Sequence, residues 1–169
     1  MSRLCAALVL CCVQPIASPA AVPGELIDFK VEDQFKKIHT RDEVRGKVFI
    51  IVGSDRGGSG FNGAWSNAIM SGIRRLGVQD QVVEVGLADL RGLPFFLKGM
   101  IRGKFAEKSG GWSIMDWKGV FPNAYGFEND RANILVFGPD GALLHRTSGQ
   151  EADPAEIRTI LEKIEAALQ

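Results

Sequence analysis

The amino-acid sequence predicts a single α/β domain with a mixed β-sheet, and three segments carry this prediction. The first is an apolar, β-branched run at residues 48–52, which leads through a glycine-rich loop into an amphipathic helical pattern. The second is a valine-rich strand pattern at residues 81–87, which completes a strand–helix–strand unit and therefore a parallel pair. The third is a hairpin around the Gly-Pro-Asp-Gly turn at residues 138–141. Its strands add antiparallel pairing, so the expected sheet is mixed.

The first half of the domain follows in order. Residues 26–40 alternate loosely and turn at residues 32–34, which predicts an extended hairpin before the first central strand. After the glycine-rich loop, apolar side chains at helical spacing predict a helix that Gly77 ends. These side chains are Trp65, Ala68, Ile69, Gly72, Ile73 and Leu76. A loop at residues 88–92 follows the second central strand.

The second half begins with a helix that Pro94 starts, and its expected apolar stripe is Leu97, Met100, Ile101 and Phe105. Four shorter segments follow: a strand at 113–115, a helical turn at 120–127, and the hairpin strands at 133–137 and 142–147. The last helix has a clear start, because Asp153 is a good cap, with proline and then glutamate suitably placed in the first turn. Its expected buried stripe is Ile157, Ile160, Leu161, Ile164 and Leu168.

Residues 1–20 have the pattern of a secretory signal peptide. Arg3 provides the positive charge, residues 4–13 the apolar core and residues 18–20 a small-residue cleavage site. That core of about ten residues is shorter than the roughly 20 that span a bilayer, so no transmembrane segment is expected. We expect export to the periplasm or beyond, cleavage near Ala20, a linker at 21–25 and one domain at 26–169. A lipid anchor retained on the cysteines of this segment is the alternative.

Charge and cysteine usage exclude several classes of function. The chain has 20 basic and 20 acidic residues, and this balance gives no support to nucleic-acid binding. The three cysteines, Cys5, Cys11 and Cys12, all lie in the predicted signal peptide. A mature domain without thiols has no disulfide, no thiolate nucleophile and no thiolate metal site.

Two stretches resemble a known family. Residues 28–52, DFKVEDQFKKIHTRDEVRGKVFIIV, resemble the opening of the redoxin branch of the thioredoxin-like superfamily, which includes peroxiredoxins, alkyl hydroperoxide reductases and secreted thioredoxin-like proteins. Residues 125–149, YGFENDRANILVFGPDGALLHRTSG, resemble the second half of that branch. The resemblance implies a three-layer α/β/α sandwich with a central mixed sheet and an N-terminal β-hairpin.

The sequence departs from this family at the residues that carry its chemistry. Counted from Lys47, the reactive cysteine positions of redoxins fall near Gly58 and Phe61, and the family's cis-proline falls near Ala132, where we expect a trans bond. The expected function is therefore an exported binding or accessory protein without thiol redox activity, which uses the former active-site loop at 54–63. The alternative is a redoxin-type oxidoreductase that acts through non-thiol residues or with a partner reductase.

The candidate binding residues are expected at the carboxyl ends of the parallel strands, where α/β proteins bind ligands. They are Ser54, Asp55, Arg56, Gly58, Ser59, Gly60, Asn62, Asp89, Arg91, Arg131 and Asn133. The expected partner is another exported protein or an anionic group held by the helix N-terminus with Arg56 and Arg131. A loop that binds nothing is the alternative. No catalytic residue, metal or cofactor is expected, and the oligomeric state is left open.

Two other patterns have competing interpretations. Residues 58–63 match the glycine spacing of dinucleotide-binding loops, with Glu84 about 20 residues on. Three residues separate the first glycine from Ser54, whereas a dinucleotide fold places that glycine at the strand end, so we favour a simple loop. An ion pair between Asp89 and Arg91 is expected to stabilise its own loop.

The remaining side chains of interest are scattered along the chain. His39 and His145 are expected to be isolated and partly exposed. The basic residues of the helix at 94–105 fit a membrane surface or an acidic partner, but a solvated face is the simpler expectation. Trp112 and Trp117 fit either the core or an exposed patch.

Overall fold

The computed structural model describes residues 22–106 and 111–169, so the predicted signal peptide and the three cysteines lie outside the described residues. The strands are β1 (Lys30–Glu32), β2 (Ile38–Thr40), β3 (Val48–Ser54), β4 (Val82–Asp89), β5 (Ser113–Asp116), β6 (Ala132–Phe137) and β7 (Leu143–Gly149). The helices are α1 (Asn62–Leu76), α2 (Lys98–Ala106), α3 (Val120–Tyr125) and α4 (Pro154–Ala167). Short 3-10 turns lie at Arg41–Val44, Gly58–Gly60, Gln79–Gln81 and Phe95–Leu97.

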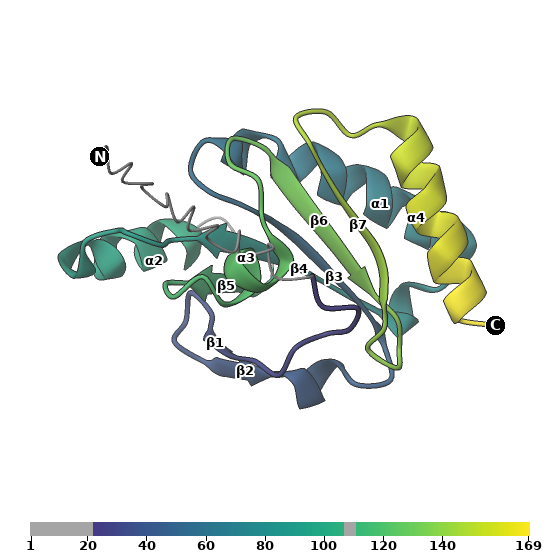
Figure 1. Cartoon of the computed structure of the whole chain (residues 1–169), viewed down its shortest axis with the longest axis horizontal. Coiled ribbons are helices and arrows are strands. Elements are labelled where there is room, and N and C mark those ends of the chain that lie inside the picture. Colours follow the sequence, from purple (N-terminus) through teal and green to yellow (C-terminus); the bar gives the residue numbers. More distant parts are fainter. Residues whose placement is uncertain (1–21, 107–110) are drawn as a thin grey trace, which may run out of the picture.

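Five strands form the central sheet in the order β5-β4-β3-β6-β7, and β1 and β2 form a separate hairpin (Figure 1). β3 runs parallel to β4, and β4 runs parallel to β5. β6 is antiparallel to both β3 and β7. The sheet is therefore mixed, as the sequence predicts.

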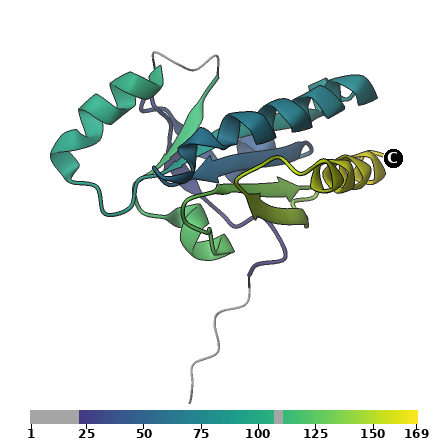
Figure 2. The same ribbon diagram turned by 90° about the horizontal axis from the view of Figure 1, so that it is seen from above.

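Alternate side chains of β3 build two separate cores, because successive residues of a strand point to opposite faces. Phe49 and Ile51 pack with the N-terminal hairpin and α3. Val48, Ile50 and Val52 pack with α1 and α4 on the other face. All five side chains are almost completely buried, as expected for a central strand covered on both sides. Figure 2 shows the resulting three layers.

The ends of α1 and α4 confirm the sequence signals. Gly77 adopts a left-handed conformation with φ of 73°, and its N–H closes the last turn of α1. The Asp153 side chain accepts a hydrogen bond from the Ala155 N–H at the start of α4. The expected stripe of α4 is buried or half-buried against the sheet.

The helix expected from Pro94 differs from the one observed. Pro94 precedes a 3-10 turn at Phe95–Leu97, and the α-helix begins only at Lys98. Of the expected stripe, only Ile101 and Phe105 pack against buried residues, and Met100 is exposed. The difference follows from the position of α2. It packs against Ala88, Leu90 and Met115 near the β4–β5 edge of the sheet and projects outward (Figure 1), so its outer side stays uncovered.

Smaller differences concern element ends. β4 continues through Ala88 and Asp89, which the sequence assigns to a loop, because both pair with β5. Among the described residues there is no cis peptide bond, so the bond before Ala132 is trans. No helix in the described part of the chain is long and apolar enough to cross a membrane.

Candidate functional site

The loop between β3 and α1 is held closed by one carboxylate. Asp55 Oδ1 accepts hydrogen bonds from the backbone N–H of Gly58 at 2.8 Å and of Asp130 at 3.2 Å. The Asn62 amide donates to Ser54 Oγ at 2.8 Å, and Ser59 Oγ donates to the carbonyl of Arg56 at 2.8 Å. The loop thus bonds to itself and to the segment before β6.

Close backbone packing joins the same two segments. A Cβ placed on Gly58 would lie 2.2 Å from the carbonyl oxygen of Arg131. A Cβ on Gly57 would lie 1.9 Å from the Asp130 carboxylate. Non-bonded atoms do not come this close, so only glycine fits at position 58 unless the Arg131 backbone moves. By contrast, nothing lies within 4 Å of a Cβ placed on Gly60.

Asn133 locks the segment before β6 from the other side. Its buried side chain accepts from the Glu128 N–H at 2.8 Å and donates to the carbonyls of Glu128 and Arg131. The carbonyl of Asp130 also accepts a hydrogen bond from Gln150 at 3.1 Å. Most backbone groups that a bound peptide would pair with here are therefore already occupied by this chain.

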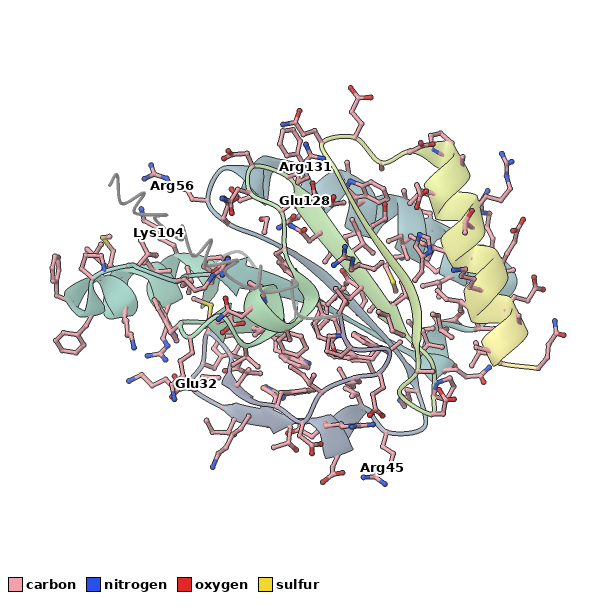
Figure 3. The ribbon with its side chains drawn as sticks, in the orientation of Figure 1. Glu32, Arg45, Arg56, Lys104, Glu128 and Arg131 are labelled. Carbon is pink, nitrogen blue, oxygen red and sulfur yellow. The ribbon has the colours of Figure 1, made fainter. Side chains whose placement is uncertain are left out.

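The two arginines expected at an anion site, Arg56 and Arg131, do not converge in the structure, and anion binding there stays a prediction. Arg131 pairs with Glu128 at 3.3 Å, whereas Arg56 is exposed and points away from both (Figure 3). The backbones of the two arginine segments are close, but their side chains diverge. Asp55 and Asp130 add negative charge beside the helix start. An external anion would compete with the carboxylate that the chain itself supplies.

Asp89 and Arg91 form the loop-stabilising pair. The Asp89 carboxylate accepts from Arg91 Nη2 at 2.6 Å and from Arg91 Nε at 2.9 Å. Arg91 Nη1 donates to the Asn123 side chain at 2.6 Å, which joins the end of β4 to α3. The hydrogen bond that Arg91 donates to Asp89 raises the pKa of Arg91 against the effect of partial burial, and the charges of Asp89, Asp116 and Asp55 add to the shift. This pair lies within electrostatic range of the β3–α1 loop, at the same end of the sheet.

A polar hollow of about 330 Å³ lies beside the segment before β6. Two of the predicted residues, Arg131 and Asn133, line it. The other lining residues are Tyr125, Gly126, Phe127, Glu128, Leu135, Arg146, Thr147 and Ser148. The sequence gives no sign of this hollow, because its walls come from α3, β6 and β7 and meet only in the folded chain.

Comparisons with known proteins find relatives by structure and not by sequence. No protein-family model matches the chain, and no curated protein matches it. Solved structures do match along nearly their whole length. A thiol:disulfide interchange protein DsbE from Chlorobium tepidum aligns with a TM-score of 0.60 at 16% identity, covering 88% of this chain and 99% of that one.

Two further structures agree. The exposed lipoprotein thioredoxin of Streptococcus pneumoniae has a TM-score of 0.60 at 14% identity, covering 83% of this chain and 99% of that one. BsSco, from the Sco family of cytochrome c oxidase assembly proteins, aligns with a TM-score of 0.56 at 14% identity. The alignment covers 91% of this chain and 98% of that one. The fold is thioredoxin-like. This confirms the fold that the sequence resemblance implies, and identities this low establish the fold alone.

In a thioredoxin-like fold the loop from β3 to α1 is the one that the resemblance equates with the redoxin active site. Gly58, the position equated with a reactive cysteine, has no space for a side chain of any kind. At this position the Arg131 backbone occupies the space that a Cβ would need.

His39 corrects the expectation of isolated histidines. It is 2% exposed, and its ring lies between two carboxylates, Asp33 at 3.0 Å and Glu43 at 2.9 Å. The ring stacks on Trp112 with centroids 3.8 Å apart, so Trp112 belongs to this cluster and is half-buried. Burial raises the pKa of Asp33, but hydrogen bonds from His39 and from the backbone of Lys37 outweigh it and lower that pKa.

Both histidines thus have acidic partners. His145 is half-buried and bonds to Glu156 at 2.7 Å. The spacing of His39 and Glu43, four residues apart, is the only sequence signal for the first cluster. No group of three or more potential ligands among the described residues is arranged to hold a metal ion.

Proposed function

We propose that this protein is a thioredoxin-fold binding or accessory protein whose domain carries out no thiol chemistry of its own. The observation that carries the proposal is the packing at Gly58, where the Arg131 backbone occupies the space of a side chain. All cysteines of the sequence lie at or before position 12, outside the described domain. Without a thiolate there is no nucleophile for disulfide exchange or peroxide reduction.

The binding surface that the geometry favours is the polar hollow beside the loop rather than the loop itself. The Asp55 carboxylate already satisfies the Gly58 and Asp130 N–H groups, whereas the hollow offers open space. Its lining includes Arg131 and Arg146, of which Arg131 pairs with Glu128 and Arg146 Nη1 donates to the Tyr125 carbonyl. A ligand carboxylate would compete with Glu128 for Arg131. A polar ligand that also carries a donor group for Glu128 therefore fits best.

A second candidate is a redoxin-type oxidoreductase that acts with a partner reductase or through non-thiol residues. Its support is the set of structural neighbours, which includes thiol:disulfide interchange proteins. The neighbours favour this second candidate, and the packing at Gly58 favours the first.

Turnover assays distinguish the two candidates. The first candidate predicts that the full chain with Cys5, Cys11 and Cys12 changed to serine neither reduces insulin disulfides nor consumes hydroperoxide above the rate of the buffer, with or without an added thiol reductant in that buffer. Measurable turnover would overturn the first candidate and support the second.

Ligand titration followed by amide NMR tests the hollow itself. We expect short peptides with a free carboxylate to shift the amides around Glu128 and Arg146. Ser148→Phe, which fills the hollow, should abolish these shifts, while Ser71→Phe on the exposed side of α1 should preserve them. Shifts that survive Ser148→Phe would move the binding surface elsewhere.

Export is also part of the proposal. It is supported by the signal-like residues 1–20 and by the similarity to an exposed lipoprotein. The intact mass of the exported protein should correspond to a chain that begins at Ala21. A mature chain that keeps a lipid on Cys11 or Cys12 would instead support the anchored alternative.

A further inference from the structure

The segment from Leu93 to Met100 exposes an unusual concentration of large apolar side chains. Phe95 is 82% exposed, Phe96 76%, Met100 55% and Leu93 40%. Only three other large apolar side chains in the described residues reach comparable exposure, at Val22, Phe35 and Ile38. These two adjacent, largely exposed phenylalanines lose most of the free energy that burial of apolar surface provides. Exposed apolar clusters of this kind mark surfaces that bind a protein, a membrane or a ligand.

The position of this segment makes it accessible. Figures 1 and 2 show α2 and the turn before it projecting from the body, at the opposite end of the molecule from α4. Only the inner side of α2 is anchored, where Ile101 and Phe105 pack with Trp117. Arg102 adds an ion pair to Glu32 of the hairpin. The helix is therefore fixed to the domain while its apolar tip stays uncovered.

The charges around the tip have one sign. Residues 90–106 contain four cationic side chains and no acidic one. Arg91 and Arg102 are neutralised by partners outside this segment. Lys98 lies over the Trp117 ring at 4.9 Å, and neither it nor Lys104 forms an ion pair within the described part of the chain. Figure 3 shows Lys104 on the projecting helix. The tip thus combines exposed phenylalanines with uncompensated positive charge.

We propose that this tip, residues 93–104, contacts the surface of an anionic lipid bilayer. Phe95 and Phe96 enter the interfacial layer, and Lys98 and Lys104 approach the lipid phosphates. Aromatic side chains flanked by lysines are the composition expected of segments that lie in this interface. Each cation close to an anionic leaflet gains about 1 kcal/mol, a roughly fivefold change in partitioning.

The size of the patch favours a bilayer over a protein partner. The four apolar side chains together offer roughly 400–600 Å² of surface, below the ~800 Å² that each partner contributes to a standard protein interface. A bilayer needs no complementary partner surface, so two phenylalanines suffice for weak and reversible attachment. The contact is peripheral, since α2 has only 9 residues and a span needs roughly 20. This proposal is independent of the binding hollow.

Fluorescence with brominated lipids tests the proposal on the full chain. The probe is Phe96→Trp, with vesicles of equal parts phosphatidylglycerol and phosphatidylcholine. After subtraction of the native tryptophan signal, we expect a blue shift and bromine quenching. The matched control is Phe35→Trp, because Phe35 is 59% exposed but lies on the β1–β2 turn. It should show neither change. Residues 1–20 are common to both variants and do not affect the comparison.

Vesicle sedimentation measures the strength of the contact. Phe95→Ser together with Phe96→Ser should weaken partitioning at least about tenfold, while Phe35→Ser leaves it unchanged. Lys104→Gln should weaken it about fivefold, and Lys47→Gln, at the other end of β3, should not. Added salt and pure phosphatidylcholine should both reduce binding.

Two results would overturn the proposal. One is equal quenching of the Phe96→Trp and Phe35→Trp variants. The other is a change in oligomeric state, measured by light scattering, when Phe95 and Phe96 become serine while vesicle binding stays the same. That second result would identify the tip as a contact between copies of this chain.

Discussion

Gly58→Ala tests the closed form of the β3–α1 loop directly. The added Cβ would lie 2.2 Å from the carbonyl oxygen of Arg131 and 2.6 Å from its carbonyl carbon. Ordinary contacts between such atoms are about 3.5 Å, so one backbone must move by about 1 Å. The Arg131 backbone resists this movement, because its carbonyl accepts a hydrogen bond from Asn133 and the neighbouring N–H binds Asp55.

The expected cost follows from these contacts. Overpacking a well-packed site costs typically 1–3 kcal/mol, and one weakened hydrogen bond adds about 0.5–1.5 kcal/mol. We expect Gly58→Ala to lower the free energy of unfolding by about 2–4 kcal/mol. For a domain of this size that corresponds to a fall in melting temperature of roughly 4–15 °C. Urea denaturation and thermal melting both measure it.

Gly60→Ala is the matched control. It lies two residues away in the same loop, nothing is within 4 Å of the added Cβ, and its φ is not positive. It should be neutral or stabilise the protein by up to about 1 kcal/mol, because alanine restricts the unfolded chain. Gly57→Ala should fall between the two, since the clash there is with the exposed Asp130 side chain, which can rotate away. Equal stability of the Gly58→Ala and Gly60→Ala variants would refute the reasoning.

Three further predictions concern buried and capping polar groups. Asp33→Asn should cost about 1–3 kcal/mol at neutral pH, because it weakens the contact with His39. The pKa of Asp33 is lower in the folded state than in the unfolded chain. The Asp33 carboxylate therefore stabilises the fold above its unfolded-state pKa, and this stabilisation is lost as the pH falls through its folded-state pKa. In urea denaturation at several pH values, the stabilities of the variant and the parent should converge in acid. Burial raises the pKa of Glu84, although the hydrogen bond from Ser66 acts in the opposite direction, so the charged carboxylate destabilises the fold at neutral pH. Glu84→Gln should therefore raise the melting temperature at neutral pH. This gain should shrink as the pH falls below the folded-state pKa of Glu84. Asp153→Ala removes the cap of α4 and should lower the free energy of unfolding by about 0.5–2 kcal/mol in chemical denaturation.

The sequence predicts correctly those helices in which the spacing of the apolar side chains agrees with the residues that mark the helix ends. α1 is an example, since its apolar stripe and the left-handed Gly77 mark both its face and its end. α4 is another, with the Asp153 cap and three fully buried or nearly buried isoleucines. α2 shows the limit. Its apolar residues predict a helix, but no local pattern reveals that the sheet ends at β5 and leaves Met100 and Phe96 uncovered.

The sequence predicts which end of the sheet carries the candidate residues, while their binding of a ligand stays a prediction. Asp89, the last residue of β4, and Arg91 lie at the same end of the sheet as the β3–α1 loop, because β3 and β4 are parallel. The hydrogen bond from Asp130 to Asp55 spans 75 residues of sequence, and no spacing rule anticipates it. The same holds for the ring of His39 on Trp112, which depends on the hairpin folding over β5.

Asp55 holds the glycine-rich loop closed without capping the helix that follows it. Such a loop attracts anions because its backbone N–H groups lack partners and lie at the positive end of the helix dipole. Here Asp55, three residues before Gly58, accepts the N–H of Gly58, which opens the 3-10 turn Gly58–Gly60, and also the N–H of Asp130. These bonds close the loop against the segment before β6. They do not cap α1, which begins at Asn62 without a side-chain cap. Anion binding at the start of α1 therefore stays a prediction, beside the polar hollow and the phenylalanine tip of α2.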